Sequence, residues 1–378
     1  MPDQKMTFRH QMLREIHEQP AGVRQTAEMA KNGLWKHLRA ISEPAKKADR
    51  ILIAASGTSR HAGLAGKIWI ETLAQMPAEV GYSSEVQHLP QASFAGALVV
   101  AITQSGETTD TMAALHRAKS AGAKSLAVCN VEEASVMKEA DASIHTKAGP
   151  ERAIPSTKAF TAQLTALFLF SLWLGKTRGA MKEADVGARL DELERIPAQM
   201  QMMLGMSAQC DALAGKYLWC EDFFFAGRGV HYPIALDGAL KLKELSYLHA
   251  EGIPTGEILH GPLAVIDEAL TIVVIATCDR HEPESMARYE NTVANIKEFR
   301  SRSGKVIALV NPCDTRVRGA VEDVIEVPDA PELLSPLLEI IPLQLFAYHR
   351  AVREGREVDH PRGLSKAVIG DRELKKAR

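Results

Sequence analysis

The sequence predicts an α/β fold made of two tandem doubly wound domains, each with a parallel sheet flanked by helices. Short apolar runs alternate with longer helical stretches, and neighbouring parallel strands need such long connections. The second half repeats the order of elements of the first, and 378 residues are enough for two domains of ordinary size. We therefore divide the chain into an N-terminal helical segment (1–45), a first domain (46–190), a second domain that starts with a connecting helix (191–354) and a C-terminal tail (355–378).

Corresponding segments of the two halves predict the same elements in the same order. Each half begins with an apolar strand that runs into a glycine-containing turn and a helix, at 51–59 with a helix from about His61, and at 223–229 with a helix over 233–249. Further strands are expected at 98–103 and 125–130, matched by 272–277 and 306–311, and each half closes with a long apolar helix, at 159–174 and 336–352. Ligands of doubly wound domains bind at the carboxyl ends of such strands, where Ser59 and the loop after residue 103 fall.

A connecting segment between the two halves, residues 178–214, is expected to be helical and amphipathic. Its apolar face consists of Leu190, Leu193, Ile196, Met200, Met203 and Leu204. The longest mainly apolar run of the chain, Leu164 to Leu174, is interrupted by Thr165 and Ser171 and is too short by itself to span a bilayer. We therefore expect no membrane-spanning segment.

The composition narrows the class of protein further. A formal net charge of −2 gives no reason to expect nucleic acid or an anionic membrane as a partner. The polar N-terminus lacks the apolar region of a secretion signal, which predicts a cytoplasmic location. The five cysteines form no Cys-x-x-Cys pair, and Cys129 and Cys278 lie in apolar strand-like runs. We expect reduced buried thiols, with no zinc or other metal site and no cofactor.

One loop points to an anion site. The stretch from Ala101 to Thr111 follows an apolar strand, and a helix is expected from Thr109 to Ala121. A helix N-terminus presents unpaired N–H groups and a positive dipole end. Thr103, Ser105 and Thr108 add hydroxyl donors, and a glycine at 106 lets the backbone approach a ligand closely. The pattern suits a phosphate monoester held without metal, but an ordinary turn with Thr108 or Thr109 as helix cap explains it equally well.

A series of further motifs gives the chain a specific resemblance. They are Met12–Pro20, Gly57–Gly63, Gln104–Thr108, Ser156–Phe160, Gly238–Glu244, His260–Pro262 and Asp359–Lys366. In this order they resemble the isomerase half of glucosamine-6-phosphate synthase, which is built from two sugar-isomerase (SIS) domains, and related SIS proteins of the glucosamine-6-phosphate deaminase type. The resemblance covers nearly the whole chain.

The resemblance implies a binding site for a hexose 6-phosphate or an amino-sugar 6-phosphate. Ser59, Gln104, Ser105 and Thr108 would hold the phosphate and nearby hydroxyls, and Ser156 would contact the sugar. Thr103 stands where the family usually has serine, and its hydroxyl can still donate a hydrogen bond. The segment Arg152–Pro155 departs from the smaller residues of the family, and its proline lacks a backbone N–H.

The same resemblance assigns catalytic roles. Glu244 corresponds to the carboxylate that transfers the proton, with Lys241 as its helper; the i,i+3 spacing places both on one helix face, although such a pair is more often solvated. His260 corresponds to a ring-opening histidine supplied by the neighbouring subunit, which implies a homodimer with a shared active site. Lys366 corresponds to the lysine that forms a Schiff base with the open-chain ketose.

The charged tail is expected to be ordered around this lysine. Pro361 would stiffen the approach, and Leu364 and Val368 would be apolar anchors on the SIS domains. Docking of this kind would partly dehydrate the Lys366 amine and favour its neutral, nucleophilic form. By composition alone the lysine would be a solvated charge.

Three functions fit these observations. The first is an aldose–ketose isomerase acting on amino sugars, which interconverts fructose 6-phosphate and glucosamine 6-phosphate by deamination or by amination with ammonia. The second is the synthase subunit of a glutamine–fructose-6-phosphate transaminase that uses a separate glutaminase. The sequence starts Met1-Pro2 and its first cysteine is Cys129, so we expect no glutamine hydrolysis by the family's N-terminal cysteine. The third is a non-catalytic amino-sugar-phosphate sensor, against which the four catalytic residues count.

Overall fold

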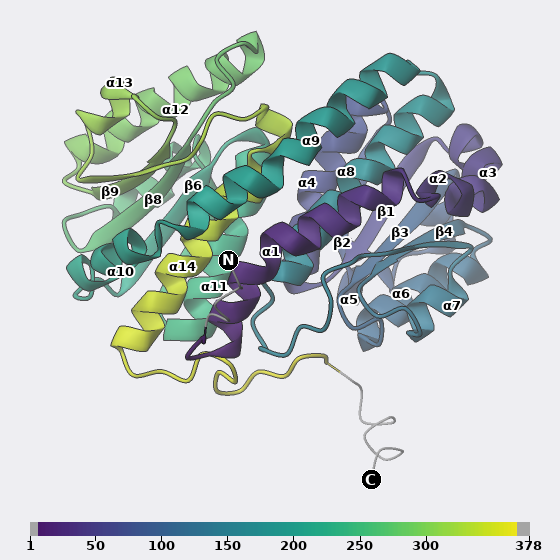
Figure 1. The fold of residues 1–378 in the computed structure, drawn as a ribbon, viewed down its shortest axis with the longest axis horizontal. Coiled ribbons are helices and arrows are strands. Elements are labelled where there is room, and N and C mark those ends of the chain that lie inside the picture. Colours follow the sequence, from purple (N-terminus) through teal and green to yellow (C-terminus); the bar gives the residue numbers. More distant parts are fainter. Residues whose placement is uncertain (1–6, 369–378) are drawn as a thin grey trace, which may run out of the picture.

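The computed structural model describes residues 7–368 and contains two five-stranded parallel sheets with the same strand order (Figure 1). The first sheet has the order β2-β1-β3-β4-β5, and the second, read from its β7 edge, has the order β7-β6-β8-β9-β10. The first comprises β1 (Arg50–Ala55), β2 (Ala78–Tyr82), β3 (Ala97–Thr103), β4 (Lys124–Cys129) and β5 (Ala142–His145). The second comprises β6 (Asp222–Gly227), β7 (His249–Pro254), β8 (Leu270–Ala276), β9 (Lys305–Val310) and β10 (Asp323–Glu326). The predicted fold of two tandem doubly wound domains is confirmed.

The central strands are those that the sequence predicted. All seven residues of β3 and all seven of β8 are buried, as expected for parallel strands covered on both faces. The edge strands β2, β5, β7 and β10 were not among the expected elements. They are short and only partly buried, so their sequences carry no continuous apolar run.

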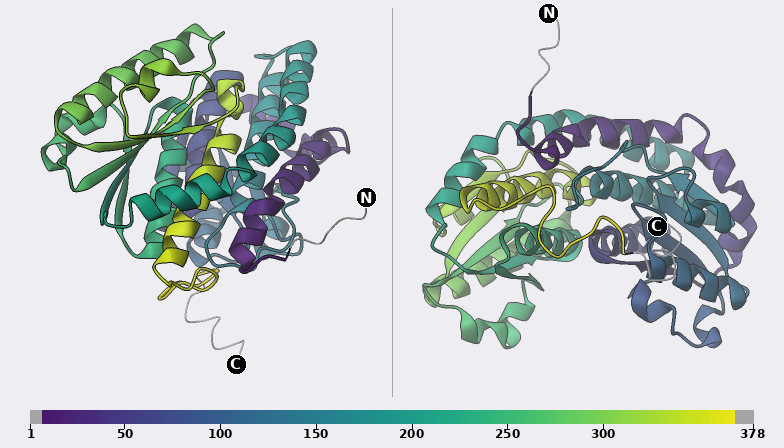
Figure 2. Two further views of the ribbon diagram at one scale, coloured as in Figure 1. Left: turned by 60° about the vertical axis from the view of Figure 1, so that its left-hand side comes forward. Right: turned by 90° about the horizontal axis from the view of Figure 1, so that it is seen from below.

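Helices cover both faces of each sheet, as the two views of Figure 2 show. The first domain has α4 (Gly57–Leu73), α5 (Ser83–Val86), α6 (Thr109–Ser120), α7 (Ser135–Glu139) and α8 (Lys158–Arg178). The second has α11 (Tyr232–Ser246), α12 (Pro283–Ser301), α13 (Thr315–Arg318) and α14 (Pro336–Arg353).

Two of these helices differ from the expected bounds. Helix α4 starts at Gly57, before the expected His61, and so places Ser59 in its first turn. Helix α11 ends at Ser246, because Tyr247 takes a left-handed conformation with a φ of 61°, and His249 opens strand β7.

The two domains share one hydrophobic core. Helix α4 packs against α8 and also contacts α11, while α11 packs against α14. The N-terminal helix α1 (Gln11–Ala27) packs on α8, α9 and α14 and so belongs to both domains. Figure 2 (right) shows α1 lying across the side where the two sheets meet. The short helices α2 (Leu34–His37) and α3 (Ser42–Lys47) complete the mainly helical N-terminal segment.

The connecting segment forms two helices. A left-handed Gly179 (φ 78°) ends α8, and the chain then forms α9 (Glu183–Leu204) and α10 (Ser207–Lys216). The expected apolar face is buried, with Leu190 packed at its margin. The domain division expected after residue 190 stays a prediction, and it falls within α9.

Helix α8 contains the longest apolar run. With 21 residues it is longer than the expected run and, by length and composition, could cross a membrane. The whole apolar window is buried inside the protein, however, where α8 packs against α1 and α4. Its apolar character is therefore accounted for by the core of the first domain.

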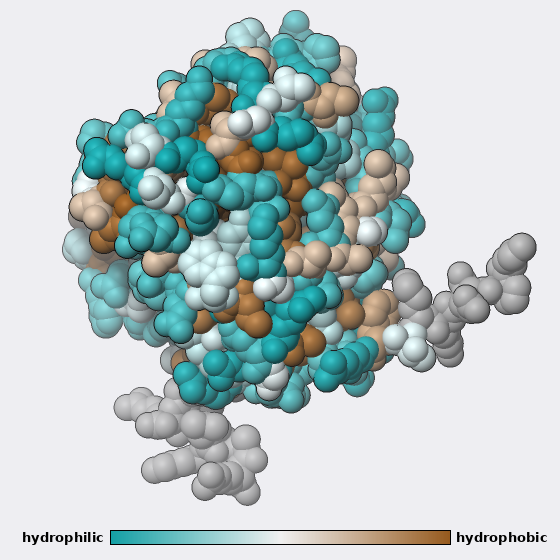
Figure 3. All heavy atoms as spheres, turned by 90° about the vertical axis from the view of Figure 1, so that its left-hand side faces the viewer, coloured by the Kyte–Doolittle hydropathy of each residue, from teal (hydrophilic) through white to brown (hydrophobic). Residues whose placement is uncertain are grey.

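The rest of the structure fits these layers. Cys129, Cys210, Cys220 and Cys278 are buried free thiols, and Cys313 is exposed. On the face shown in Figure 3, hydrophilic residues cover most of the surface, and hydrophobic residues gather mainly in the hollows between them.

Candidate active site

A cavity of about 260 Å³ lies at the carboxyl ends of β1 and β3, against the start of α4 and the loop before α6. Segments far apart in the sequence contribute to its wall. Eight of the ten predicted site residues line it: Ser59, Thr103, Gln104, Ser105, Thr108, Ser156, Glu244 and Lys366. The ninth, Lys241, is buried and bonded to Glu244, and the tenth, His260, lies outside this cavity.

The loop between β3 and α6 keeps its hydroxyl groups on the cavity side. The Thr103 hydroxyl accepts a hydrogen bond from the N–H of Gly106 and lies 3.0 Å from the Thr108 hydroxyl. Gly106 has a φ of 76°, and a Cβ at this position would overlap the methyl group of Ala134. The Thr108 side chain occupies the N-cap position of α6 without capping the helix. Its hydroxyl is therefore not consumed by the ordinary capping role that the sequence left open.

The electrostatics of the cavity favour an anion. The first turns of α4 and α6 both lie at its wall, and helix N-termini carry a partial positive charge. The acid of the loop, Glu107, points away and accepts a hydrogen bond from the N–H of Ser135. Gln104 Oε1 is buried and has no hydrogen-bond partner within residues 7–368. The arrangement can hold a phosphate through hydroxyl, amide and backbone donors.

Lys241 and Glu244 form a close pair, of which Glu244 lines the cavity. The Lys241 ammonium, whose side chain is fully buried, lies 2.6 Å from Glu244 Oε2, whereas the Glu244 side chain keeps 20% of its surface exposed. Burial would lower the pKa of Lys241, but Glu244 and Asp237 together raise it above its ordinary value. Lys241 is therefore a permanent cation behind a carboxylate that faces the cavity. A solvated surface pair, the ordinary expectation for this spacing, is excluded.

Lys366 reaches the cavity from the tail. Its amine donates hydrogen bonds to Glu151 Oε2 at 2.5 Å and to the carbonyl of Ala153 at 2.7 Å. The side chain keeps 25% of its surface exposed, so it is partly dehydrated as expected, and the amine is ion-paired with Glu151. Its role as the Schiff-base nucleophile stays a prediction.

The tail docks through groups other than the expected anchors. Leu364 and Val368 are 42% and 66% exposed, so they do not anchor the segment. Val358 and Pro361 are buried instead. Polar contacts complete the docking, because the tail passes over a helix end and two loops that offer free backbone donors.

Asp359 makes the most important of these polar contacts. Its carboxylate accepts hydrogen bonds from the N–H groups of Gln11 and Met12 at the start of α1. Its own carbonyl accepts a hydrogen bond from the N–H of Ile154. At the far end, the carbonyl of Val368 accepts one from the N–H of Thr109. The tail thereby connects α1, the loop before α8 and the start of α6.

Two buried acids that the sequence analysis missed organise the loop before α8. Glu151 accepts hydrogen bonds from the N–H groups of Thr157 and Ala159 while it holds Lys366. Glu15 on α1 accepts one from the N–H of Arg152 at 2.5 Å, and burial raises the pKa of Glu15 to about 7. Isolated acids in a loop and on an amphipathic helix carry no sequence pattern. Only the fold brings them to the lysine.

His260 lies outside the cavity of its own chain. It ends the short 3-10 helix η5 (Glu257–His260), is exposed, and is followed by Gly261 with a φ of 134°. Its neighbours Leu259 and Val265 are also exposed, by 39% and 57%. Its assignment to a shared active site stays a prediction.

The chain belongs to the SIS domain family, which matches residues 46–172 and 219–353, one match for each sheet. Several relatives of one kind match nearly the whole chain. The chain is 41% identical over 367 residues to the glutamine–fructose-6-phosphate aminotransferase (isomerizing) of Thermus thermophilus, and 42% identical over 365 residues to that of Aquifex aeolicus. These alignments cover 97% of this chain but 59% and 58% of the relatives, so the chain spans about three fifths of their length.

Solved structures agree. The C-terminal domain of the glucosamine-fructose-6-phosphate aminotransferase from Francisella tularensis superposes with a TM-score of 0.85 at 36% identity, covering 93% of this chain and 99% of that one. A glucosamine-6-phosphate deaminase from Thermotoga maritima has a TM-score of 0.62 at 20% identity, covering 92% and 100%, and shares the fold alone. The resemblance to the isomerase half of the synthase, drawn from the motifs, is confirmed.

Proposed function

We propose that the chain is a phosphosugar aldose–ketose isomerase acting on amino sugars, which interconverts fructose 6-phosphate and glucosamine 6-phosphate. The observation that carries the proposal is the convergence of three distant segments on one cavity: the hydroxyl loop 103–108, Glu244 of α11, and Lys366 of the tail. A binding protein for a sugar phosphate needs only the first of these. The names of the most similar relatives support the same substrates.

The geometry suggests a separate role for each group of residues. The loop and the two helix N-termini hold the phosphate, which fixes the remote end of the sugar and orients its reacting carbons. Lys366 first gives a proton to Glu151 or to solvent, and its amine then attacks the C2 carbonyl of the open-chain ketose. Water leaves, and a Schiff base forms between Nζ and C2.

Proton transfer then falls to Glu244. In the synthetic direction ammonia replaces Lys366 at C2, and the lysine leaves as the amine. Glu244 removes a proton from C1 and returns it at C2, while the proton of the C1 hydroxyl passes to the imine nitrogen. C1 thereby becomes the aldehyde, and the amino group stays on C2. The buried cation Lys241 holds the Glu244 carboxylate in place before it takes the proton and after it returns the proton. Deamination is the same sequence in reverse.

A second candidate is the isomerase part of a glutamine-dependent enzyme, favoured by the name of the relatives, glutamine–fructose-6-phosphate aminotransferase. In that case the nitrogen comes from a glutaminase unit rather than from free ammonia. Rates with ammonium, and with glutamine plus a glutaminase, distinguish the two candidates.

The site is proposed to be completed by a second copy of the chain. His260 is exposed beside apolar Leu259 and Val265, as a residue presented to a partner would be. Mixing a His260→Ala chain with a Glu244→Gln chain should restore part of the activity through hybrid sites. A chain that is monomeric in sedimentation and fully active at the same concentration contradicts this arrangement.

The decisive experiment uses Lys366. Borohydride added with fructose 6-phosphate should fix the sugar on Lys366, and peptide mapping identifies the site. Lys366→Ala should lose turnover by about 10³-fold or more, because it removes the nucleophile, while sugar-phosphate binding persists. Lys119→Ala, a lysine of α6 whose amine bonds to the Glu139 carbonyl, is the matched control and should stay active. Near-normal turnover of Lys366→Ala, or an adduct elsewhere, would favour a plain enediol isomerase run by Glu244.

A further inference from the structure

A buried histidine–aspartate pair lies directly behind the proposed proton-transfer site. Asp237 of α11 is fully buried, and His61 Nδ1 lies 3.0 Å from its Oδ1. Asp237, Lys241 and Glu244 follow one another along one face of α11 at helical spacing. Neither Asp237 nor His61 lines the cavity, so neither touches a sugar bound there.

The pair changes the charge balance around Lys241. Burial raises the pKa of Asp237, but the charge of Lys241 and the hydrogen bond from His61 outweigh it and lower the pKa below its ordinary value. Asp237 is therefore ionised, and Lys241 faces two carboxylates on its own helix. The other groups that act on this cluster are Thr58 and His61 from α4 and Glu151 from the loop before α8.

The pair also joins the two domains. His61 belongs to α4, whose first turn carries Ser59 of the proposed phosphate site, whereas Asp237 belongs to α11, which carries Glu244. The hydrogen bond between them ties the helix that binds the phosphate to the helix that moves the proton.

The fold itself does not require charge at this place. Gly57 and Gly229 are equivalent positions of the two repeats, since each follows the first strand and has a positive φ, 53° and 59°. Counted from these glycines, Asp237 corresponds to Ala65 and Lys241 to Trp69, and both of these apolar residues are completely buried. A buried ionic cluster is costly, and apolar residues of similar volume often replace one without loss of stability. Its presence on α11 alone therefore points to the reaction.

We propose that Asp237 and His61 are positioning residues for the isomerisation assigned above, on which this inference rests. Lys241 interacts with Asp237 as well as with Glu244. Its hold on Glu244 is therefore weak enough for Glu244 to accept a proton from C1. His61 fixes the Asp237 carboxylate and so keeps Glu244 in a constant position relative to the bound phosphate.

Kinetics of matched variants test the proposal. Asp237→Asn leaves the Lys241 charge to Glu244 alone, which makes Glu244 a weaker proton acceptor. We expect kcat to fall by about 10- to 100-fold, KM for fructose 6-phosphate to change by less than about 3-fold, and the acid limb of the kcat profile to move to lower pH.

Variants of His61 keep the test decisive if Asp237→Asn folds poorly. His61→Asn places an amide N–H where Nδ1 lies and should retain kcat, whereas His61→Leu should lower it. The double variant His61→Leu/Asp237→Asn should be no worse than Asp237→Asn alone, because the two residues act as one unit. His116→Leu, which removes an exposed pair between His116 of α6 and Glu139 of α7, is the control and should change nothing.

The outcomes separate this inference from the proposed function. If the wild type is active and forms the Lys366 adduct, but His61→Leu and Asp237→Asn keep its kcat and pH profile, the positioning role is overturned. A rise in KM alone also overturns it, because the pair would then serve binding. If the wild type shows neither turnover nor adduct, the proposed function itself fails.

Discussion

The two SIS domains share their strand order and their first turn, yet they differ in what that turn carries. Counted from Gly57 and Gly229, Ser59 of the first domain corresponds to His231 of the second. Ser59 lines the cavity, and its hydroxyl accepts a hydrogen bond from Gln163 of α8. His231 is buried and lies 2.9 Å from Glu339 of α14.

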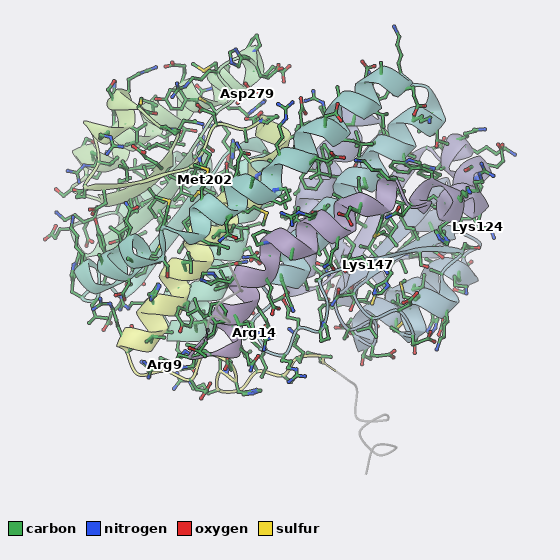
Figure 4. All side chains as sticks on the ribbon, in the orientation of Figure 1. Arg9, Arg14, Lys124, Lys147, Met202 and Asp279 are labelled. Atoms are coloured by element: carbon green, nitrogen blue, oxygen red, sulfur yellow. The ribbon has the colours of Figure 1, made fainter. Side chains whose placement is uncertain are left out.

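The loops after β3 and β8, the third strand of each domain, also differ in the side chains that they carry. In the second domain the equivalent cavity, of about 340 Å³, is lined by four acids and two arginines: Asp279, Glu282, Glu284, Glu332, Arg189 and Arg288. Arg288 is already paired with Glu332. In the view of Figure 4, Asp279 is labelled near the upper edge of the molecule and Arg14 of α1 near the lower edge. The two domains thus share one scaffold, but the first cavity is lined by the hydroxyls of the proposed phosphate loop, whereas half of the residues that line the second are charged.

The largest expected effect comes from weakening the buried ion cluster of the second domain, which consists of His231, Glu332 and Glu339. Glu339→Gln leaves the buried His231 cation with a weaker partner, so the free energy of unfolding should fall by about 3–5 kcal/mol. The KM for the sugar phosphate should stay the same, because the first-domain cavity is untouched. Urea unfolding and steady-state kinetics measure the two quantities. Glu326→Gln, in an exposed pair with Arg318, should cost little stability. A changed KM with unchanged stability would mean that the second domain also binds substrate.

A smaller effect should follow from adding an acid to the loop between β3 and α6, so that it resembles the acidic loop after β8. Ser105→Asp places a carboxylate in the proposed phosphate cavity, and repulsion should weaken sugar-phosphate binding by about 100-fold. Ser105→Ala, which only removes a hydroxyl, is the control and should cost about 10-fold. Isothermal titration with fructose 6-phosphate measures both. Equal affinity of the aspartate variant and the wild type would place the phosphate elsewhere.

The smallest effect concerns pH. Burial alone would lower the pKa of His231, but Glu339 and Glu332 raise it to about 10, above its ordinary value of 6.5. The folded state therefore keeps a proton that the unfolded state releases, so this stabilisation is complete below pH 6.5 and disappears as the pH rises towards 10. Its slope is at most about 1.4 kcal/mol per pH unit. Unfolding at pH 7, 8 and 9 should show the loss in the wild type. The same slope in His231→Gln would assign it to another group.

The sequence predicted the parts of the molecule that depend on local pattern. Apolar runs located the six inner strands, β1, β3, β4, β6, β8 and β9, and the hydroxyl loop and the motifs located eight of the residues that line the cavity. The helix bounds were less certain, because Tyr247 ends α11 through its own left-handed conformation rather than through a glycine.

Contacts between distant segments could not be predicted in this way. Glu151, Glu15 and Asp237 are isolated acids whose partners lie on other elements. The tail was expected to dock through apolar side chains, but the Asp359 carboxylate, the Lys366 amine and two backbone carbonyls of the tail make its main polar contacts with distant elements. Burial of a charge beside its partner is a property of the folded chain alone.

The contact between Lys366 and Glu151 has a consequence for the synthesis of the protein. The two residues are separated by 215 positions, and the whole second domain is made between them. Domains generally fold in order as they emerge from the ribosome. A nascent chain with a finished first domain already has its hydroxyl loop, but it lacks Lys366 and Glu244. Under the proposed function such a chain would have neither the nucleophile nor the proton-transfer carboxylate, so we expect an interrupted translation product to be chemically inert.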